Sequence, residues 1–379
     1  MEQVRILIII NNELTLYNFR QEFLQLLVSD GNEVYIATPK GKYRSLFESF
    51  GCNVIEYELS QRGMNPLKDF RLPWRYKRII KSVNPDAVLT YTIKPNIYGG
   101  IACNWTHKPY IATITGLGSA FEKGSTVAKV SFFLYKLGLK KVSKVFFQNS
   151  AHEQLFAGKG LAEGRHVVVS GSGVNLTKHC FEPYPSEEND IKFLFVGRVT
   201  KDKGVDELFE AFSKIRETYP EKKVHLGILG NTEEGYDSVV QELDKQDAFS
   251  FYGRHENVHD YVKEVHAVVL PSYHEGMANV LLEAAACGRP VIASLIPGCR
   301  ETFDNGVTGI GCEARSVDSL YNALDSFVKM DENQHREMGR KGREKVEKEF
   351  DRDKVNATYL RVIKEIVFKG SWNNESCTN

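Results

Sequence analysis

The stretch LPSYHEGMANVLLEAAACGRP, residues 270–290, decides how this chain is interpreted. The apolar run that ends at Leu270 is typical of a buried strand, and a short polar loop and an Ala- and Leu-rich helical segment follow it. Gly288 and Pro290 form the usual stop signal of a helix. The stretch therefore predicts a strand, a loop and a helix in that order, which is the local unit of an α/β fold.

Two glutamates of this unit are spaced for an elongated ligand. Glu275 lies in the loop and Glu283 inside the helix, so at ~1.5 Å per residue they are separated by roughly 12 Å along the helix axis. Between them the helix N-terminus offers free backbone N–H groups and a positive dipole end, which suit a diphosphate. The residues expected to meet the donor there are Gly276, Met277, Ala278, Asn279 and Val280. The pattern predicts a nucleotide-sugar site.

Each glutamate also has an ordinary interpretation. A glutamate in a strand-to-helix loop is most often a solvated loop residue. Glu283 is different, because leucines and alanines surround it and its burial would require a partner. The whole pattern resembles the family 4 retaining glycosyltransferases of GT-B fold, whose E-x7-E motif it matches at both glutamates.

A second segment carries two cations at the end of a predicted strand. The buried run 192–196 leads into a loop with Arg198 and Lys203, and the carboxyl ends of strands are where open α/β sheets bind ligands. A solvated turn is the alternative that these residues leave open. The loop fits the G-R-x4-K-G motif of the same family at Gly197, Arg198, Lys203 and Gly204. The resemblance implies that the two cations stabilise charge on the leaving nucleoside diphosphate, as a metal does elsewhere.

The resemblance also assigns the remaining site residues. It implies that Arg198, Lys203 and Glu275 are catalytic and that Glu283 holds the donor ribose. Further donor contacts are expected from Gly173, Gly197, Gly230 and Arg254. The sequence has no Asp-x-Asp and no His/Cys cluster with metal-ligand spacing, so we expect no metal and no cofactor.

The N-terminal half resembles a narrower group, the bacterial transferases that extend lipid-linked N-glycan, O-antigen and capsule precursors with N-acetylhexosamines. The matching stretches imply acceptor contacts at Tyr17, Arg20, Lys94, Asn96, Thr115 and Gly116. Two loops depart from the family pattern: residues 11–13 have no Gly-Gly pair, and Thr115 and Gly116 stand where many members have a histidine. The catalytic base is therefore unassigned, and the family implies same-face attack in which the departing phosphate takes the acceptor proton.

Strand–helix alternation runs through both halves and predicts parallel sheets. The chain has 379 residues, 42% of them hydrophobic and 26% charged, enough for two domain cores. We expect a GT-B fold: two Rossmann-like, doubly wound α/β domains with a cleft between them. The expected parts are an acceptor-binding domain (1–172), a linker (173–190), a nucleotide-sugar-binding domain (191–350), a helix that crosses back to the first domain (351–369) and a disordered tail (370–379).

Composition favours a cytoplasmic protein. Seven cysteines without framework spacing indicate reduced thiols. The longest apolar runs, such as residues 6–10, are far shorter than the ~20 residues of a transmembrane helix. No signal-peptide pattern precedes the first predicted strand.

The net charge of zero hides an uneven distribution. Residues 1–170 hold 22 Lys/Arg against 13 Asp/Glu, a balance of +9, and the rest of the chain carries −9. No nucleic-acid-binding module is recognisable, so an anionic membrane surface is the favoured partner. Two segments mix basic and aromatic residues as interfacial helices do, namely 68–81 and 125–147. A core helix with a solvated basic face is the alternative for the second.

Together these patterns predict a retaining glycosyltransferase. It would move N-acetylgalactosamine or another N-acetylhexosamine from a UDP-sugar to a lipid-diphosphate-linked sugar, at the inner face of the cell membrane, in polysaccharide, O-antigen, capsule or glycan assembly. One alternative is a soluble family relative with a small acceptor, such as a sucrose- or trehalose-type synthase. Another is an inactive regulator that binds UDP.

Overall fold

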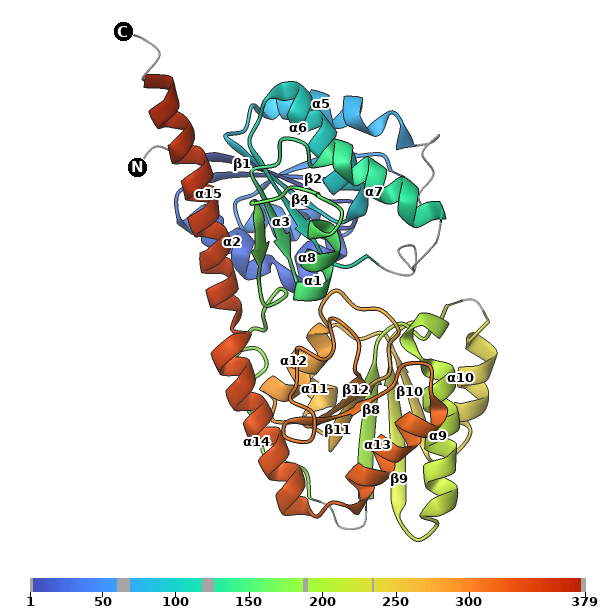
Figure 1. Ribbon diagram of the computed structural model, residues 1–379. Coiled ribbons are helices and arrows are strands. Elements are labelled where there is room, and N and C mark those ends of the chain that lie inside the picture. The colour runs from blue at the N-terminus through green and yellow to red at the C-terminus, as the bar shows by residue number, and fades with distance from the viewer. Residues whose placement is uncertain (1–2, 60–68, 118–125, 187–189, 234, 376–379) are drawn as a thin grey trace. The chain divides into compact units, whose positions relative to one another are not determined.

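Two compact units make up the chain in a computed structural model, which describes residues 3–59, 69–117, 126–186, 190–233 and 235–375 (Figure 1). The first unit comprises Met1–Ser172 together with Asp353–Asn379, and the second comprises Gly173–Arg352. Each unit is built on one parallel sheet with helices on its faces. The prediction of two doubly wound α/β sheets is confirmed.

The sheet of the first unit has seven strands in the order β3-β2-β1-β4-β5-β6-β7. The strands are β1 (Arg5–Ile9), β2 (Glu33–Pro39), β3 (Asn53–Tyr57), β4 (Ala87–Tyr91), β5 (Tyr110–Ile114), β6 (Lys144–Phe147) and β7 (His166–Val168). Strand β1 pairs with both β2 and β4, so the order reverses beside it. The central strands β4 and β5 are buried at every position, as expected of a parallel sheet covered on both faces.

The sheet of the first unit separates two hydrophobic core layers, and helices cover both of its faces. These helices are α1 (Glu13–Phe19), α2 (Gln21–Ser29), α3 (Arg44–Ser49), α5 (Leu72–Val83), a π-helical turn η1 (Pro95–Gly99), α6 (Gly100–Thr106), α7 (Thr126–Gly138), α8 (Ser150–Ala157) and α15 (Arg352–Glu375). Successive side chains of β1 point to opposite faces. Leu7 and Ile9 therefore join the core on one side of the sheet, whereas Ile6 and Ile8 join the core on the other.

Helix α15 returns the end of the chain to the first unit, where its Tyr359 is fully buried. The Tyr359 ring stacks on Phe146 with centroids 4.1 Å apart. The Arg20 guanidinium lies over the rings of Tyr91 and Tyr359 and donates to the Tyr359 hydroxyl at 3.3 Å. The helix continues past Gly370, where the sequence predicted a disordered tail, because one glycine costs a helix only about 1 kcal/mol.

The sheet of the second unit has six parallel strands in the order β10-β9-β8-β11-β12-β13. The strands are β8 (Asp190–Val196), β9 (Lys223–Leu229), β10 (Phe249–Gly253), β11 (Ala267–Leu270), β12 (Val291–Ser294) and β13 (Gly309–Cys312). The helices are the 3-10 turn η3 (Lys201–Lys203), α9 (Val205–Thr218), α10 (Asp237–Asp244), α11 (His259–Val262), α12 (Asn279–Ala286), α13 (Val317–Lys329) and α14 (Glu332–Glu349). Strand β13 was not predicted, because two of its four residues are glycine.

The segment predicted as a linker, 173–190, packs onto the second unit where the structure describes it. Arg289 is fully buried and donates to the backbone carbonyls of Glu182 at 3.1 Å and Pro183 at 2.7 Å. At the start of the segment, Val174 pairs with Asp351 in a short parallel bridge. A buried guanidinium needs such acceptors because it keeps its charge, so Arg289 fixes the path of this segment.

We expect Tyr359→Ala to destabilise the first unit by about 3–5 kcal/mol, because it leaves a cavity beside Phe146 and removes a ring that contacts Arg20. Urea unfolding followed by fluorescence and circular dichroism measures the loss. Arg361→Ala is the matched control on the exposed side of the same helix, where the arginine only pairs with Glu365; its loss should stay below about 0.5 kcal/mol. Equal midpoints for the two variants would contradict this account of α15.

Candidate functional site

Both predicted motifs lie at the point where the strand order of the second sheet reverses. Strand β8 pairs with β9 on one side and with β11 on the other. The loop with Arg198 and Lys203 follows β8, and the loop with Glu275 follows β11. In open parallel sheets the carboxyl ends of the strands at such a reversal form the ligand site. The topology therefore brings the two motifs together.

The two loops touch backbone to backbone. Gly204 has φ +69°, and a Cβ atom there would lie 2.1 Å from the Pro271 carbonyl oxygen. Next to this contact, the Tyr273 N–H donates to the Asp202 carbonyl at 2.9 Å. Only glycine combines this φ value with so close an approach. Packing alone therefore requires a glycine as the last residue of the G-R-x4-K-G motif.

Lys203 and Glu275 form a direct ion pair. The Lys203 ammonium donates to Glu275 Oε1 at 2.5 Å, and the Ser272 hydroxyl donates to the same oxygen at 2.8 Å. The side chains are 20% and 13% exposed, so the pair is sheltered and still reachable from solvent. Ser272 is a site residue that the sequence did not single out, because a serine in a strand-to-helix loop carries no signal of its own.

Arg198 lies at the edge of the same loop and pairs with Glu233. Its side chain is 64% exposed, far more than that of Lys203. Exposed ion pairs of this kind contribute little to stability. Both predicted cations therefore lie beside the reversal point, each held by a carboxylate of the protein, and Arg198 is the one that can move at little cost.

Glycine backbones also shape the other predicted donor positions. A Cβ atom on Gly230 would lie 1.8 Å from the Gly197 carbonyl oxygen, and one on Gly173 would lie 2.5 Å from the Cα of Arg352. Arg254 is exposed just past β10. Gly230 and Gly173 thus allow close backbone contacts, while the Arg254 side chain extends into solvent.

Helix α12 starts between the two glutamates without a side-chain cap. The Ala278 N–H donates to the Gly298 carbonyl at 2.8 Å. The Met277 side chain is buried in a small apolar cluster, so Met277 can offer a ligand only its backbone. Asn279 Oδ1 is buried and has no hydrogen-bond partner within the described part of the chain. An unsatisfied buried acceptor of this kind is costly.

Glu283 is nearly buried on α12, with 15% of its side chain exposed. Burial raises the pKa of this carboxyl to about 7, although the positive charges of Arg352 and Lys178 act in the opposite direction. His179 lies beside it, with Nε2 3.9 Å from Glu283 Oε1. The structure thus buries Glu283, the residue for which the sequence predicted that burial would require a partner. Strongly shifted carboxyls of this kind concentrate at functional sites.

The residues predicted to meet an acceptor lie in the first unit, and most make contacts within it. Asn96 is fully buried, donates to the Thr113 carbonyl and accepts from Thr90, each at 2.8 Å. Lys94 is buried in an ion pair with Asp69 at 3.1 Å.

Two more of these six residues pack against aromatic rings. Tyr17 stacks on Tyr43 with centroids 3.9 Å apart, and Arg20 contacts the ring of Tyr359 as described above. Arg20, Lys94 and Asn96 thus hold the unit together, because an acceptor cannot reach side chains buried in this way. Thr115 and Gly116, which are half-buried just past β5, have the more accessible positions.

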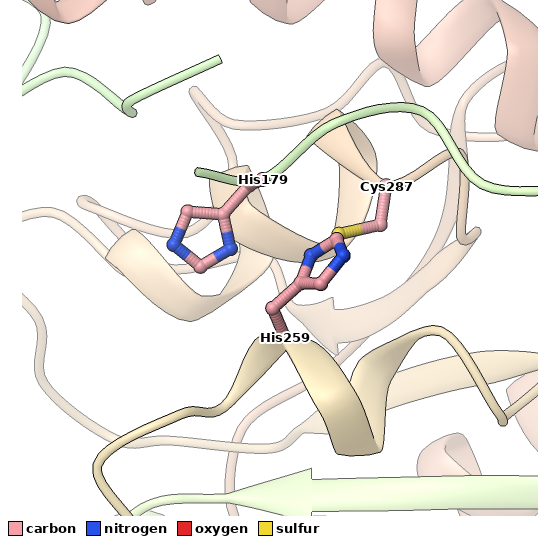
Figure 2. A group of neighbouring side chains, drawn as sticks. All are labelled: His179, His259 and Cys287. Atoms are coloured by element: carbon pink, nitrogen blue, oxygen red, sulfur yellow. The ribbon is translucent and has the colours of Figure 1, made fainter. Parts of the chain in front are cut away.

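Three potential metal ligands also meet in the second unit. His179, His259 and Cys287 place ligand atoms within 4.8 Å of one another (Figure 2). The sequence analysis found no metal-ligand spacing because these residues come from three distant segments. No motif spacing could have revealed them.

Comparison with known families agrees with this geometry. Residues 178–345 match the family described as glycosyl transferases group 1, and residues 5–149 match the family described as glycosyl transferase 4-like. The chain therefore belongs to the glycosyltransferases.

Two curated relatives are similar over most of the chain. The N,N'-diacetylbacillosaminyl-diphospho-undecaprenol alpha-1,3-N-acetylgalactosaminyltransferase of Campylobacter jejuni is 26% identical over 331 residues, which cover 83% of this chain and 86% of the relative. The capsular polysaccharide biosynthesis glycosyltransferase CapM of Staphylococcus aureus is 24% identical, with 95% and 97% covered.

Solved structures confirm the GT-B fold. A sucrose-phosphate synthase from Thermosynechococcus elongatus superposes with a TM-score of 0.79 at 20% identity, and the match covers 96% of this chain and 99% of that one. The Anabaena protein HepE, solved in complex with UDP, gives 0.77 at 18% identity, with 95% and 100% covered. Within the described residues, no helix has the length and apolar character to cross a membrane.

We expect Glu283→Gln to raise the melting temperature at pH 8 by about 3 °C or more. The folded-state pKa is raised, to about 7 from 4.5, so folding disfavours the charged form. The resulting penalty is absent below pH 4.5, grows as the pH rises to 7 and is complete above it. Glutamine removes the penalty, so the gain should shrink towards zero on acidification.

Thermal melts of both proteins between pH 4.5 and 8.5 measure this difference. Glu217→Gln, at an exposed position of α9, is the control and should show no pH-dependent gain. A Glu283→Gln protein that melts below wild type at pH 8 would mean that the carboxylate is stabilising, and the account of its burial would be wrong.

Proposed function

We propose that this glycosyltransferase is a retaining enzyme of family 4 that uses a UDP-sugar donor and a lipid-diphosphate-linked sugar as acceptor. The transferred sugar is an N-acetylhexosamine, with N-acetylgalactosamine the first candidate. The observation that carries the proposal is the Lys203–Glu275 pair at the strand reversal, with Glu283 on the adjoining helix. The Campylobacter relative, named for an undecaprenol-diphosphate-linked substrate and N-acetylgalactosaminyl transfer, supports the choice of sugar and acceptor, and the UDP-bound Anabaena protein supports the nucleotide.

Lys203 and Arg198, each in an ion pair with a carboxylate of the protein, form a diphosphate clamp, and binding of the donor breaks both ion pairs. Without donor, Lys203 is neutralised by Glu275 and Arg198 by Glu233. A diphosphate offers each cation a stronger partner, because it carries more charge than one carboxylate. Lys203 then turns to the phosphates, and Glu275 is released to accept hydroxyl donors of the sugar ring. Glu283, at the other end, accepts the ribose hydroxyls.

The chemistry that follows requires charge stabilisation on the leaving group. As the bond between the sugar and the diphosphate breaks, negative charge grows on the departing oxygen. Arg198 and Lys203 are the cations beside it, and the N-terminus of α12, which has no side-chain cap, adds the positive end of a helix dipole. The departing phosphate takes the proton of the acceptor hydroxyl as that hydroxyl attacks the same face of the sugar. No metal ion takes part in these steps.

We expect Lys203→Ala and Arg198→Ala each to lower kcat by ~100-fold or more, because each removes a cation from the place where charge develops. Lys201→Ala is the control: this lysine is exposed in the same turn η3, and its loss should leave kcat within about twofold. Release of UDP from UDP-N-acetylgalactosamine, measured with a lipid-linked acceptor, reports the rates. If both alanine variants turned over like wild type, the clamp would be excluded.

An aromatic and basic surface on the first unit supports the lipid-linked acceptor. On α5 and α6, Trp74 is 53% exposed and Trp105 42% exposed, and their rings are 5.1 Å apart. Lys77 lies over the Trp105 ring at 5.7 Å. Aromatic rings beside cations are the usual composition of a surface that enters the headgroup layer of a membrane. Lys68, the first residue of this predicted segment, lies outside the described residues.

Helix α7 has apolar residues on two faces. One face is buried in the unit through Ala128 and Tyr135. Another face leaves Val130, Phe133 and Leu137 exposed, Phe133 at 61%. A core-packing helix explains the buried face only. A helix that lies in a membrane interface explains the exposed apolar face. The end of the predicted segment 125–147 forms the strand β6 (Lys144–Phe147).

We expect the triple substitution of Lys136, Lys140 and Lys141 by Glu to weaken binding to anionic vesicles by about 100-fold or more. The three lysines are exposed at and after the end of α7, and each cation near an anionic surface contributes ~1 kcal/mol. Flotation with phosphatidylserine-containing vesicles measures binding, and neutral vesicles are the control. Phe133→Ser should remove part of the binding that survives high salt. Wild-type binding by the triple variant would favour the core interpretation and a soluble enzyme with a small acceptor.

A further inference from the structure

His179, His259 and Cys287 converge from three separate segments of the second unit (Figure 2). His179 follows the bridge at Val174, His259 begins α11, and Cys287 is the C-cap of α12. His179 is 4% exposed, Cys287 is fully buried and the His259 side chain is 11% exposed. The two imidazole rings lie edge to face, with centroids 5.8 Å apart and planes inclined by 70°. Two imidazoles and a thiol thus share one nearly dry space.

The hydrogen bonds of His259 aim one of its nitrogens into this space. Its Nε2 lies 2.9 Å from Glu182 Oε1, and the hydrogen bond from His259 lowers the pKa of that carboxyl. An ionised carboxylate can only accept, so Nε2–H is the donor of this hydrogen bond, and in the neutral form of the ring this tautomer leaves Nδ1 without a proton. Nδ1 then carries the lone pair, and it lies 3.1 Å from Cys287 Sγ. A carboxylate behind an imidazole is the usual outer shell of a metal-bound histidine.

The donor set selects the class of ion. Two neutral imidazoles and one thiolate are borderline-soft ligands, the combination that Zn²⁺ prefers over Mg²⁺ or Ca²⁺. With bonds of about 2.1 Å to nitrogen and 2.3 Å to sulfur, neighbouring ligand atoms of a tetrahedral ion lie about 3.5 Å apart. The three atoms here lie within 4.8 Å of one another, so small rotations of the side chains bring them to the distances that three ligands of one ion require.

We propose that His179, His259 and Cys287 bind one Zn²⁺ ion, a site separate from the diphosphate clamp. Binding forms a zinc–sulfur bond and releases the Cys287 thiol proton to solvent, while each histidine binds through a nitrogen lone pair. The ion needs no donor sugar, so the proposal stands independently of the proposed function. Its position matters for that function, because Glu283 Oε1 lies 3.9 Å from His179 Nε2 and Glu283 is on the same helix face as Cys287, four residues before it. A cation here favours the charged form of Glu283.

Two other arrangements compete with this site. In the first, the Cys287 thiol simply donates to His259 Nδ1 and no ion binds. In the second, an ion is held on the outer side of His259 by Cys180 and Glu182, which also gather around its Nε2. Cys180 is exposed, so the second arrangement lies closer to solvent than the first. The two cysteines separate these possibilities.

Cobalt(II) is the probe, because a cobalt–thiolate bond gives a charge-transfer band and tetrahedral cobalt gives intense d–d bands. The full-length, reduced and chelator-treated protein should bind one equivalent of Co²⁺ with both signatures, and Zn²⁺ should displace it. Cys287→Ser should abolish the charge-transfer band and weaken Co²⁺ binding by more than about 100-fold, since loss of an outer-shell partner alone costs ~10–100-fold. His179→Gln should weaken binding while the charge-transfer band persists at high Co²⁺.

The controls are Cys180→Ser and Cys103→Ser, the latter at a buried cysteine of α6 in the first unit. Both should bind Co²⁺ as wild type does, and circular dichroism should show every variant folded. A band lost in Cys180→Ser and kept in Cys287→Ser would place the ion on the outer side of His259 and overturn the proposal. Absence of any thiolate band in wild type would leave only the thiol–imidazole hydrogen bond, and this outcome would overturn it as well.

Discussion

The site depends on one constraint, the backbone contact between the loops that follow β8 and β11. Gly204 approaches the Pro271 carbonyl so closely that no side chain fits there. This contact places Lys203, next to that glycine, within hydrogen-bonding distance of Glu275 on the other loop. A bulkier residue at position 204 would separate the loops and with them the cation and the carboxylate. The packing of two neutral backbones thus determines the electrostatics of the site.

Helix α12 carries candidate ligand groups at its N-terminus and in its middle, at some cost in stability. Its N-terminus is uncapped and leaves Asn279 Oδ1 unsatisfied, and its middle buries Glu283. A helix selected for stability alone would have a capping side chain and an apolar residue in place of that carboxylate. Such local costs are typical of ligand sites, where binding supplies the missing partners. The buried face that Glu283 shares with Cys287 further connects the proposed nucleotide site with the proposed zinc site.

The first unit shows how differently a motif resemblance and a fold use the same residues. Arg20 and Asn96 match stretches of the narrower transferase group, yet Arg20 lies among tyrosine rings under α15 and Asn96 joins two strands by hydrogen bonds. Their role in this structure is to hold the sheet and the returning helix in place. The exposed aromatic and basic residues of α5, α6 and α7 form the surface that we propose for an acceptor and a membrane.

The sequence by itself determined the local units, the parallel sheets and the placement of both motifs. It could do so because hydrophobic period and helix stop signals are local, and because the carboxyl ends of parallel strands share one edge. Strand β13 could not be predicted from the sequence, since Gly-Ile-Gly-Cys becomes a strand only beside β12. Only the tertiary structure decided that Lys203 pairs with Glu275, that Glu283 is buried, and that Cys287 meets His179 and His259. These contacts join residues far apart in the chain, and no local pattern encodes which distant side chains the packing of the sheet brings together.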